Sequence, residues 1–101
     1  MTIEILYFEG CPNHASALQV VRDVLGGLGV DAEVREVEVK GAEDASRLRF
    51  FGSPTIQIEG MDIDPTVHGR TDYSFSCRMY GGTGTPSRDL VERAIRERMG
   101  L

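Results

Sequence analysis

One short apolar segment near the start of the chain constrains the fold more than any other feature. The run Ile3–Phe8 is apolar at five of its six positions and is rich in β-branched and aromatic side chains. A run of this length and composition is typical of a strand that is buried on both faces. The sequence therefore predicts that this strand lies in the middle of an α/β sheet.

Helical and strand patterns alternate after this strand. We expect a helix over Pro12–Leu28, because apolar residues recur there at helical spacing and proline suits the first helical position. A second strand is predicted over Val30–Lys40, with a bulge or an exposed strand end near Arg35–Glu36. A helix that connects two strands of one sheet usually makes them parallel.

The second half of the chain completes the order βαβαββα. A short helix over Ala42–Phe51 is expected to turn Ala45, Leu48 and Phe51 inward. Thr55–Glu59 alternates like a strand, and Met61–Asp64 is predicted to pair with it. We expect Asp62 and Asp64 to face solvent and protect the sheet edge. The last helix is predicted to begin with Thr85 as its cap and Pro86 at its first position.

The segment Pro65–Gly84 shows no clear periodicity. A structureless loop of this length is uncommon in a compact domain and tends to be functional or disordered. Its three aromatic residues, Tyr73, Phe75 and Tyr80, argue against disorder. We therefore treat this segment as an insertion before the last helix.

Composition indicates one ordinary globular domain over residues 1–101, with 41% apolar residues and a net charge of −5. The negative charge and the scattered basic residues argue against nucleic acid and anionic membranes as partners. The chain begins like a strand and not like a secretory signal, and no stretch approaches the roughly 18 apolar residues of a membrane-spanning helix. We therefore predict a cytoplasmic protein.

The two cysteines, Cys11 and Cys77, are the first candidates for chemistry. In a reducing compartment, two cysteines are more often reactive or metal-binding than structural. Cys11 precedes the predicted first helix, where unsatisfied N–H groups and the helix dipole stabilise a thiolate. His14, one turn further on, would add a positive charge or carry a proton. Cys11 is therefore predicted to be an activated thiol.

Two motifs resemble those of the thioredoxin/glutaredoxin superfamily. The run Phe8-Glu9-Gly10-Cys11-Pro12 is similar to its active-site cysteine turn, and Gly52-Ser53-Pro54-Thr55-Ile56 is similar to its cis-proline loop. The wider pattern is similar to small bacterial thioredoxin-like proteins, some of which are labelled alkylmercury lyase-like. The resemblance covers Met1–Asp64 and Thr85–Leu101.

The resemblance implies a thioredoxin-like three-layer sandwich with Cys11 as the nucleophile. Pro54 would form a cis peptide bond and face Cys11, and the backbone of Ser53, Pro54 and Thr55, with Pro12 beside the cysteine, would bind the substrate chain. Two departures are visible: His14 stands where the family has its second cysteine, and the insertion Pro65–Gly84 is not part of the family pattern.

Three functions follow as hypotheses. The first is a thiol–disulfide oxidoreductase, or a related redox protein, that acts on a protein or small-molecule disulfide. Cys11 would attack the substrate, and Cys77 or an external thiol such as glutathione would resolve the mixed disulfide. A Cys11–Cys77 bond needs Cα atoms within about 7 Å. The second hypothesis is capture of a soft metal or an organomercurial by both thiols, with Asp72 as the nearest proton donor in sequence to Cys77. The third is a non-catalytic interaction module.

Cys11, His14, His68 and Cys77 also form a nominal zinc set, but their spacing matches no standard zinc motif. We expect neither a bound metal nor a cofactor.

Overall fold

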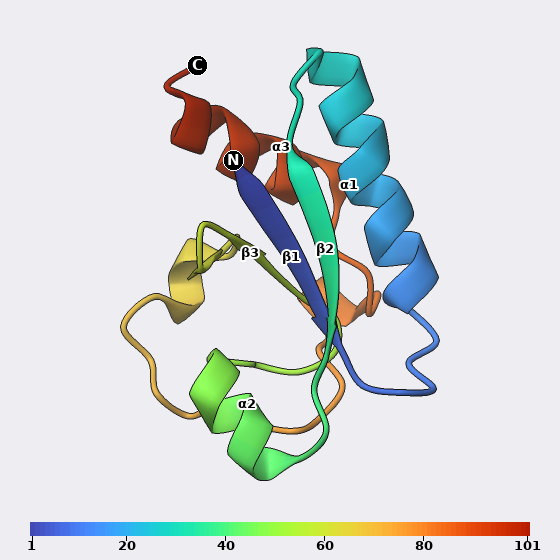
Figure 1. Cartoon of the computed structure of the whole chain (residues 1–101), viewed down its shortest axis with the longest axis vertical. Helices are drawn as coiled ribbons and strands as arrows, with labels where there is room; N and C mark the ends of the chain where they lie inside the picture. Colours follow the sequence, from blue (N-terminus) through green and yellow to red (C-terminus); the bar gives the residue numbers. More distant parts are fainter.

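The computed structural model describes residues 1–101 and shows an α/β fold in the predicted order βαβαββα. The strands are β1 (Thr2–Tyr7), β2 (Glu33–Glu38), β3 (Thr55–Ile58) and β4 (Met61–Asp62), and they form one mixed sheet in the order β2-β1-β3-β4. β1 and β2 are parallel, whereas β3 is antiparallel to both β1 and β4. This arrangement is consistent with a thioredoxin-like fold, as predicted (Figure 1).

The central strand β1 divides the apolar core into two clusters. On one face, Ile3 and Ile5 pack with Val21 of α1 (His14–Leu28) and Ile95 of α3 (Arg88–Met99). On the other face, Leu6 packs with residues of and around α2 (Ala42–Leu48), namely Val39, Ala45 and Phe50. β1 is therefore buried on both faces, with α1 and α3 on one side of the sheet and α2 on the other (Figure 1).

None of the helices is both long and apolar enough to cross a lipid bilayer.

The same division explains the mixed pattern of the second strand. β2 pairs with β1 in an unbroken register from Thr2–Glu33 to Tyr7–Glu38, so the strand contains no bulge. Val34 packs against the α1/α3 cluster and Val37 against the α2 cluster. Residues three apart on a strand point to opposite faces, so both phases of the sequence pattern are used. Arg35 and Glu36 are exposed within this edge strand.

Two helix ends in the first half of the chain differ from the sequence prediction. α1 begins at His14 and not at Pro12, because Pro12 and Asn13 form a turn closed by the bond from the His14 N–H to the Cys11 carbonyl (3.5 Å). α2 ends at Leu48, since Arg49 adopts a left-handed conformation (φ 58°). As a result Phe50, and not Phe51, is fully buried.

The start of the last helix also differs. Ser87, and not Thr85, caps α3 by accepting a hydrogen bond from the Leu90 N–H at 3.1 Å. The Thr85 hydroxyl instead bonds Asn13 Oδ1 and lies 3.1 Å from Ser16 Oγ, so it links the start of α1 to the loop before α3.

The insertion follows an ordered path from β4 to α3. It contains two short 3₁₀ turns, Pro65–Val67 and Tyr80–Gly82. Between them the chain passes α2 and reaches the carboxyl end of β1 (Figure 1). We call Ser74–Tyr80 the strap. Its exposure alternates: Phe75, Cys77 and Met79 are exposed, whereas Arg78 is buried and Tyr80 is half-buried.

Candidate functional site

The loop before β3 has the predicted cis-proline. The Ser53–Pro54 peptide bond is cis, and both residues are buried. The Thr55 hydroxyl donates to the Gly52 carbonyl at 2.6 Å and accepts from the Phe51 N–H at 3.3 Å, which closes the loop on itself. Because Thr55 pairs with Leu6, this loop lies at the carboxyl end of β1.

Cys11 lies in the turn between β1 and α1, at the same end of β1. Its side chain is half-buried, and the neighbouring Pro12 is exposed. The cap position of α1 belongs to Asn13, whose side chain makes no capping bond. Cys11 therefore precedes the helix cap by two residues, and it does not occupy the helix terminus that the sequence predicted for it.

His14, the first residue of α1, lies between two other elements. Its ring stacks on Tyr7 of β1 with centroids 3.7 Å apart and an interplanar angle of 11°. Its Nε2 atom is 2.7 Å from Glu36 Oε1 of β2, at ion-pair distance but without the direction of a hydrogen bond. The side chain of His14 thus reaches β2. The backbone of His14 bonds to Cys11, through a long bond from the His14 N–H to the Cys11 carbonyl (3.5 Å).

The strap lies against the cis-proline loop and binds its backbone. The Ser53 N–H donates to the Ser76 carbonyl at 2.7 Å, and the Arg78 N–H donates to the Ser53 carbonyl at 3.0 Å. These bonds form a parallel β-bridge between Ser53 and Cys77. The Ser74 N–H also donates to the Phe50 carbonyl at 2.9 Å. Both backbone groups of Ser53, which the resemblance assigns to substrate, therefore already have partners within the chain.

A buried ion pair holds the strap in place. Arg78 Nη1 is 2.6 Å from Asp62 Oδ2 and Nη2 is 3.1 Å from Asp62 Oδ1, and both side chains are less than a tenth exposed. The expectation that Asp62 faces solvent was wrong, because this carboxylate is the counter-charge of a buried guanidinium. Burial alone would lower the pKa of Arg78, but the bonds to Asp62 and the nearby negative charges raise it overall.

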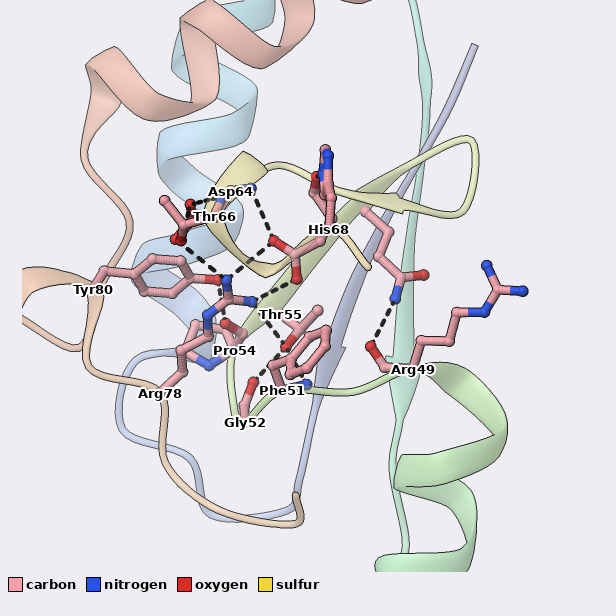
Figure 2. Close-up of polar contacts among 12 residues, drawn as sticks. Arg49, Phe51, Gly52, Pro54, Thr55, Asp64, Thr66, His68, Arg78 and Tyr80 are labelled. Carbon is pink, nitrogen blue, oxygen red and sulfur yellow. Dashed lines mark hydrogen bonds and ion pairs between the residues drawn. The ribbon is translucent and has the colours of Figure 1, made fainter. Parts of the chain in front are cut away.

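Tyr80 adds a second anchor beside the ion pair. Its hydroxyl donates to the Pro54 carbonyl at 2.6 Å, and its ring lies 4.6 Å from the Arg78 guanidinium carbon (Figure 2). Burial raises the pKa of Tyr80, so its hydroxyl remains protonated as a donor over the physiological pH range. Neither Arg78 nor Tyr80 was singled out as an anchor from the sequence. No sequence signal marks these two roles, because the alternation of exposure along the strap is seen only in the structure.

Close approach of the strap also explains one glycine. Gly52 has φ +114°, and a Cβ atom there would lie 3.0 Å from the Arg78 backbone nitrogen and 3.1 Å from the Ser76 carbonyl oxygen. Only glycine combines this backbone conformation with room for the neighbouring chain.

Cys77 lines an open cleft of about 680 Å³ at the ends of β1 and β2. The walls include Phe8 and Phe75, whose ring centroids are 5.4 Å apart, and the charged residues Glu9, Glu38 and Lys40. Two further hollows, of about 440 and 230 Å³, contain no cysteine. Cys77 thus borders the Phe8–Glu9 turn that leads to Cys11, and both thiols are free.

The nominal zinc set is not brought together. No group of three or more His, Cys, Asp or Glu side chains is placed to hold a metal ion. His68 Nε2 instead lies 2.6 Å from the Asp62 carbonyl oxygen. Asp72, the candidate proton donor, forms an ion pair with Arg70.

Comparison with known proteins found no match. No family model, no curated protein and no solved structure is significantly similar to this chain. The class that the fold and the site define is therefore a small α/β domain with a mixed four-stranded sheet and two free thiols.

Proposed function

We propose that the protein is a thiol–disulfide exchange protein in which Cys11 attacks a disulfide and Cys77 is the candidate resolving thiol. The supporting observation is that two cysteines far apart in sequence lie on loops at one end of β1. Cys11 follows β1 directly, and Cys77 bridges Ser53, whose hydroxyl accepts from the Phe8 N–H at 3.3 Å. The resemblance implies that Pro54 faces Cys11, and Ser53 of the same loop is the bridge partner of Cys77.

The proposed exchange has two steps. The Cys11 thiolate attacks one sulfur of a substrate disulfide, so that a Cys11–substrate disulfide forms and the other substrate sulfur leaves as a thiolate and takes up a proton. The Cys77 thiolate then attacks Cys11 Sγ, which releases the second substrate thiol. The substrate has gained two electrons, and the two cysteines have lost them as a disulfide. Two molecules of a low-molecular-weight thiol return both cysteines to the reduced form and become a disulfide themselves.

Both thiols are free in this structure, so the second step forms a bond that the reduced protein does not contain. When Cys77 does not reach Cys11, an external thiol attacks the substrate sulfur of the mixed disulfide. That thiol then leaves joined to the substrate, and the Cys11 thiolate is restored. The two routes give different products and are therefore separable by mass.

A comparison of two single variants tests the proposal. With a chromogenic aromatic disulfide as substrate, Cys11→Ser is expected to lose the fast release of the coloured thiol, whereas Cys77→Ser keeps it. Intact mass spectrometry should then show a persistent mixed disulfide in Cys77→Ser and an internal disulfide in the native protein. Circular dichroism controls for folding. Unchanged release by Cys11→Ser would overturn the role of Cys11.

Soft-metal capture remains the second candidate, because thiolates prefer soft ions and both thiols are free. Titration with Hg(II) against a competing small thiol tests it. One ion bound per chain, with loss of tight binding in either cysteine variant, would favour capture, provided that the native protein exchanges disulfides no faster than Cys11→Ser does.

A further inference from the structure

The strap pairs with both backbone groups of Ser53 in the cis-proline loop. We propose that the site acts on disulfides of small molecules and excludes disulfides carried in extended polypeptide chains, because the strap already fills the place of a substrate strand. This inference rests on the proposed exchange chemistry of Cys11 and assigns its substrate class.

The first argument concerns the backbone. An extended peptide binds beside a sheet or loop mainly by pairing its own N–H and C=O groups with unpaired ones. At the cis-proline loop, the Ser53 N–H and C=O are bonded to Ser76 and Arg78 at 2.7 and 3.0 Å. A peptide can pair with Ser53 only after both bonds are broken.

The second argument concerns how firmly the strap is held. Displacing it would pull Arg78 away from Asp62, at 2.6 Å, and the Tyr80 hydroxyl away from the Pro54 carbonyl, also at 2.6 Å. The Arg78–Asp62 contact is buried and the Tyr80–Pro54 contact is partly buried, and a buried charge that loses its partner is strongly unfavourable. Figure 2 shows Arg78 and Tyr80 converging on the cis-proline loop, so one movement would have to break both anchors.

The third argument concerns the space that remains. The cleft beside Cys77 has a volume of about 680 Å³, and small-molecule sites are typically about 300–1,000 Å³. Its aromatic walls, Phe8 and Phe75, and its charges of both signs, Glu9, Glu38 and Lys40, suit a small amphiphilic molecule. A small disulfide bound in this cleft would lie against Cys77 and the Phe8–Glu9 turn, which leads to Cys11, while the strap stays in place.

The test uses two substrates with the same reacting bond. One is the symmetric disulfide of N-acetylcysteine N-methylamide. The other is an uncharged eight-residue extended peptide whose central cysteine is joined to the same blocked cysteine. We expect the native protein to react at least about tenfold more slowly with the peptide. The peptide must break the two strap bonds to Ser53, and the loss of one hydrogen bond changes a rate by up to about tenfold. Equal rates, or a faster reaction with the peptide, would overturn the inference.

A pair of strap variants shows whether the strap is the cause. Tyr80→Ala removes the bond to Pro54 and the ring beside Arg78, and it should raise the peptide rate several-fold while the small-disulfide rate stays the same. Met79→Ala is the matched control, because this neighbouring side chain is exposed (61%) and touches neither anchor. Amide hydrogen exchange at Ser53 and Arg78 should become faster in Tyr80→Ala only.

The possible outcomes are distinguishable. If the native protein reacts with neither substrate faster than Cys11→Ser does, the proposed function fails and this inference with it. If it reacts with both equally while the Ser53 and Arg78 amides stay protected, the exchange chemistry stands and the strap has no role in selection. If Tyr80→Ala does not fold, the rate ratio and amide protection of the native protein decide the question.

Discussion

The sheet with its helices and the inserted segment 65–84 are held together by different forces. Of the buried hydrophobic residues, only Val67 lies within the insertion, whereas all the others belong to the rest of the chain. The insertion is instead fixed by backbone bonds to Ser53, by the Arg78–Asp62 ion pair and by the Tyr80 hydroxyl. Apolar burial is non-directional and is spread over many contacts, whereas polar anchors depend on a few exact partners. The insertion should therefore respond abruptly to single changes that the rest of the fold would tolerate.

The largest effect is expected from removing the strap's positive charge. Arg78→Met leaves Asp62 buried without its partner and should lower the free energy of unfolding by about 3–5 kcal/mol. The double variant Asp62→Leu/Arg78→Met removes both charges and should recover most of that loss. Urea denaturation measures all three proteins. A double variant as unstable as Arg78→Met would show that shape, and not the unpaired charge, governs this contact.

The next effect concerns the close approach of the strap to Gly52. Gly52→Ala combines a strained φ of +114° with a Cβ atom 3.0 Å from the Arg78 backbone nitrogen. Gly60→Ala is the matched control, because Gly60 also has a positive φ (+80°) but has no atom within 4 Å of the added Cβ. Strain at such positions costs on the order of 1–3 kcal/mol. We expect Gly52→Ala to be clearly the more destabilising, and equal effects would mean that the strap yields freely.

The contrast between the two regions also separates what the sequence could predict from what it could not. The apolar periods predicted the element order, the central position of β1 and its parallel pairing with β2, because burial repeats every two residues in strands and every 3.6 in helices. The resemblance of Gly52–Ile56 to the cis-proline loop of thioredoxin-like proteins predicted the cis bond before Pro54. These are local or periodic signals that one sequence carries.

The strap has no such signal. Asp62 was expected to face solvent because, on a short edge strand, a carboxylate is normally exposed. Its burial depends on Arg78, which lies in a segment without periodicity, and nothing in a single sequence joins the two. Cys77 precedes Arg78 in the strap, so its bridge to Ser53 was equally invisible in the sequence. The boundary of α1 is a smaller case, since the hydrogen-bonded turn Cys11–His14 precedes the helix.

A smaller effect distinguishes the two candidate caps of α3. Ser87→Ala removes the acceptor of the Leu90 N–H and should cost about 1 kcal/mol of stability. Thr85→Ala removes only the exposed contact with Ser16 and the partly buried, longer bond to Asn13 (3.3 Å), and it should cost less. Hydrogen exchange of the Leu90 amide should become faster in Ser87→Ala alone. Faster exchange in Thr85→Ala would restore Thr85 as the functional cap.

The smallest effect concerns Asp64, at the border between the sheet and the insertion. Burial acts to raise the pKa of its carboxyl, but bonds from the Thr66 amide (2.9 Å) and hydroxyl (2.7 Å), with the charge of Arg78 at 3.7 Å, hold that pKa below its usual range. A carboxyl whose pKa is lower in the folded than in the unfolded state stabilises the fold at neutral pH. That contribution is lost as the pH falls from about 4 through the folded pKa.

Asp64→Asn keeps an oxygen that accepts from Thr66 and removes the charge. At pH 7 it should therefore lower the free energy of unfolding by roughly 0.5 kcal/mol, as is usual for a partly exposed ion pair. At a pH below the folded-state pKa, where this carboxyl is protonated in both states of the native protein, the two proteins should converge. Urea titrations at both pH values measure the difference. A gap of the same size at both would show that Asp64 stabilises the border by its hydrogen bonds alone and that its charge contributes nothing to holding Arg78.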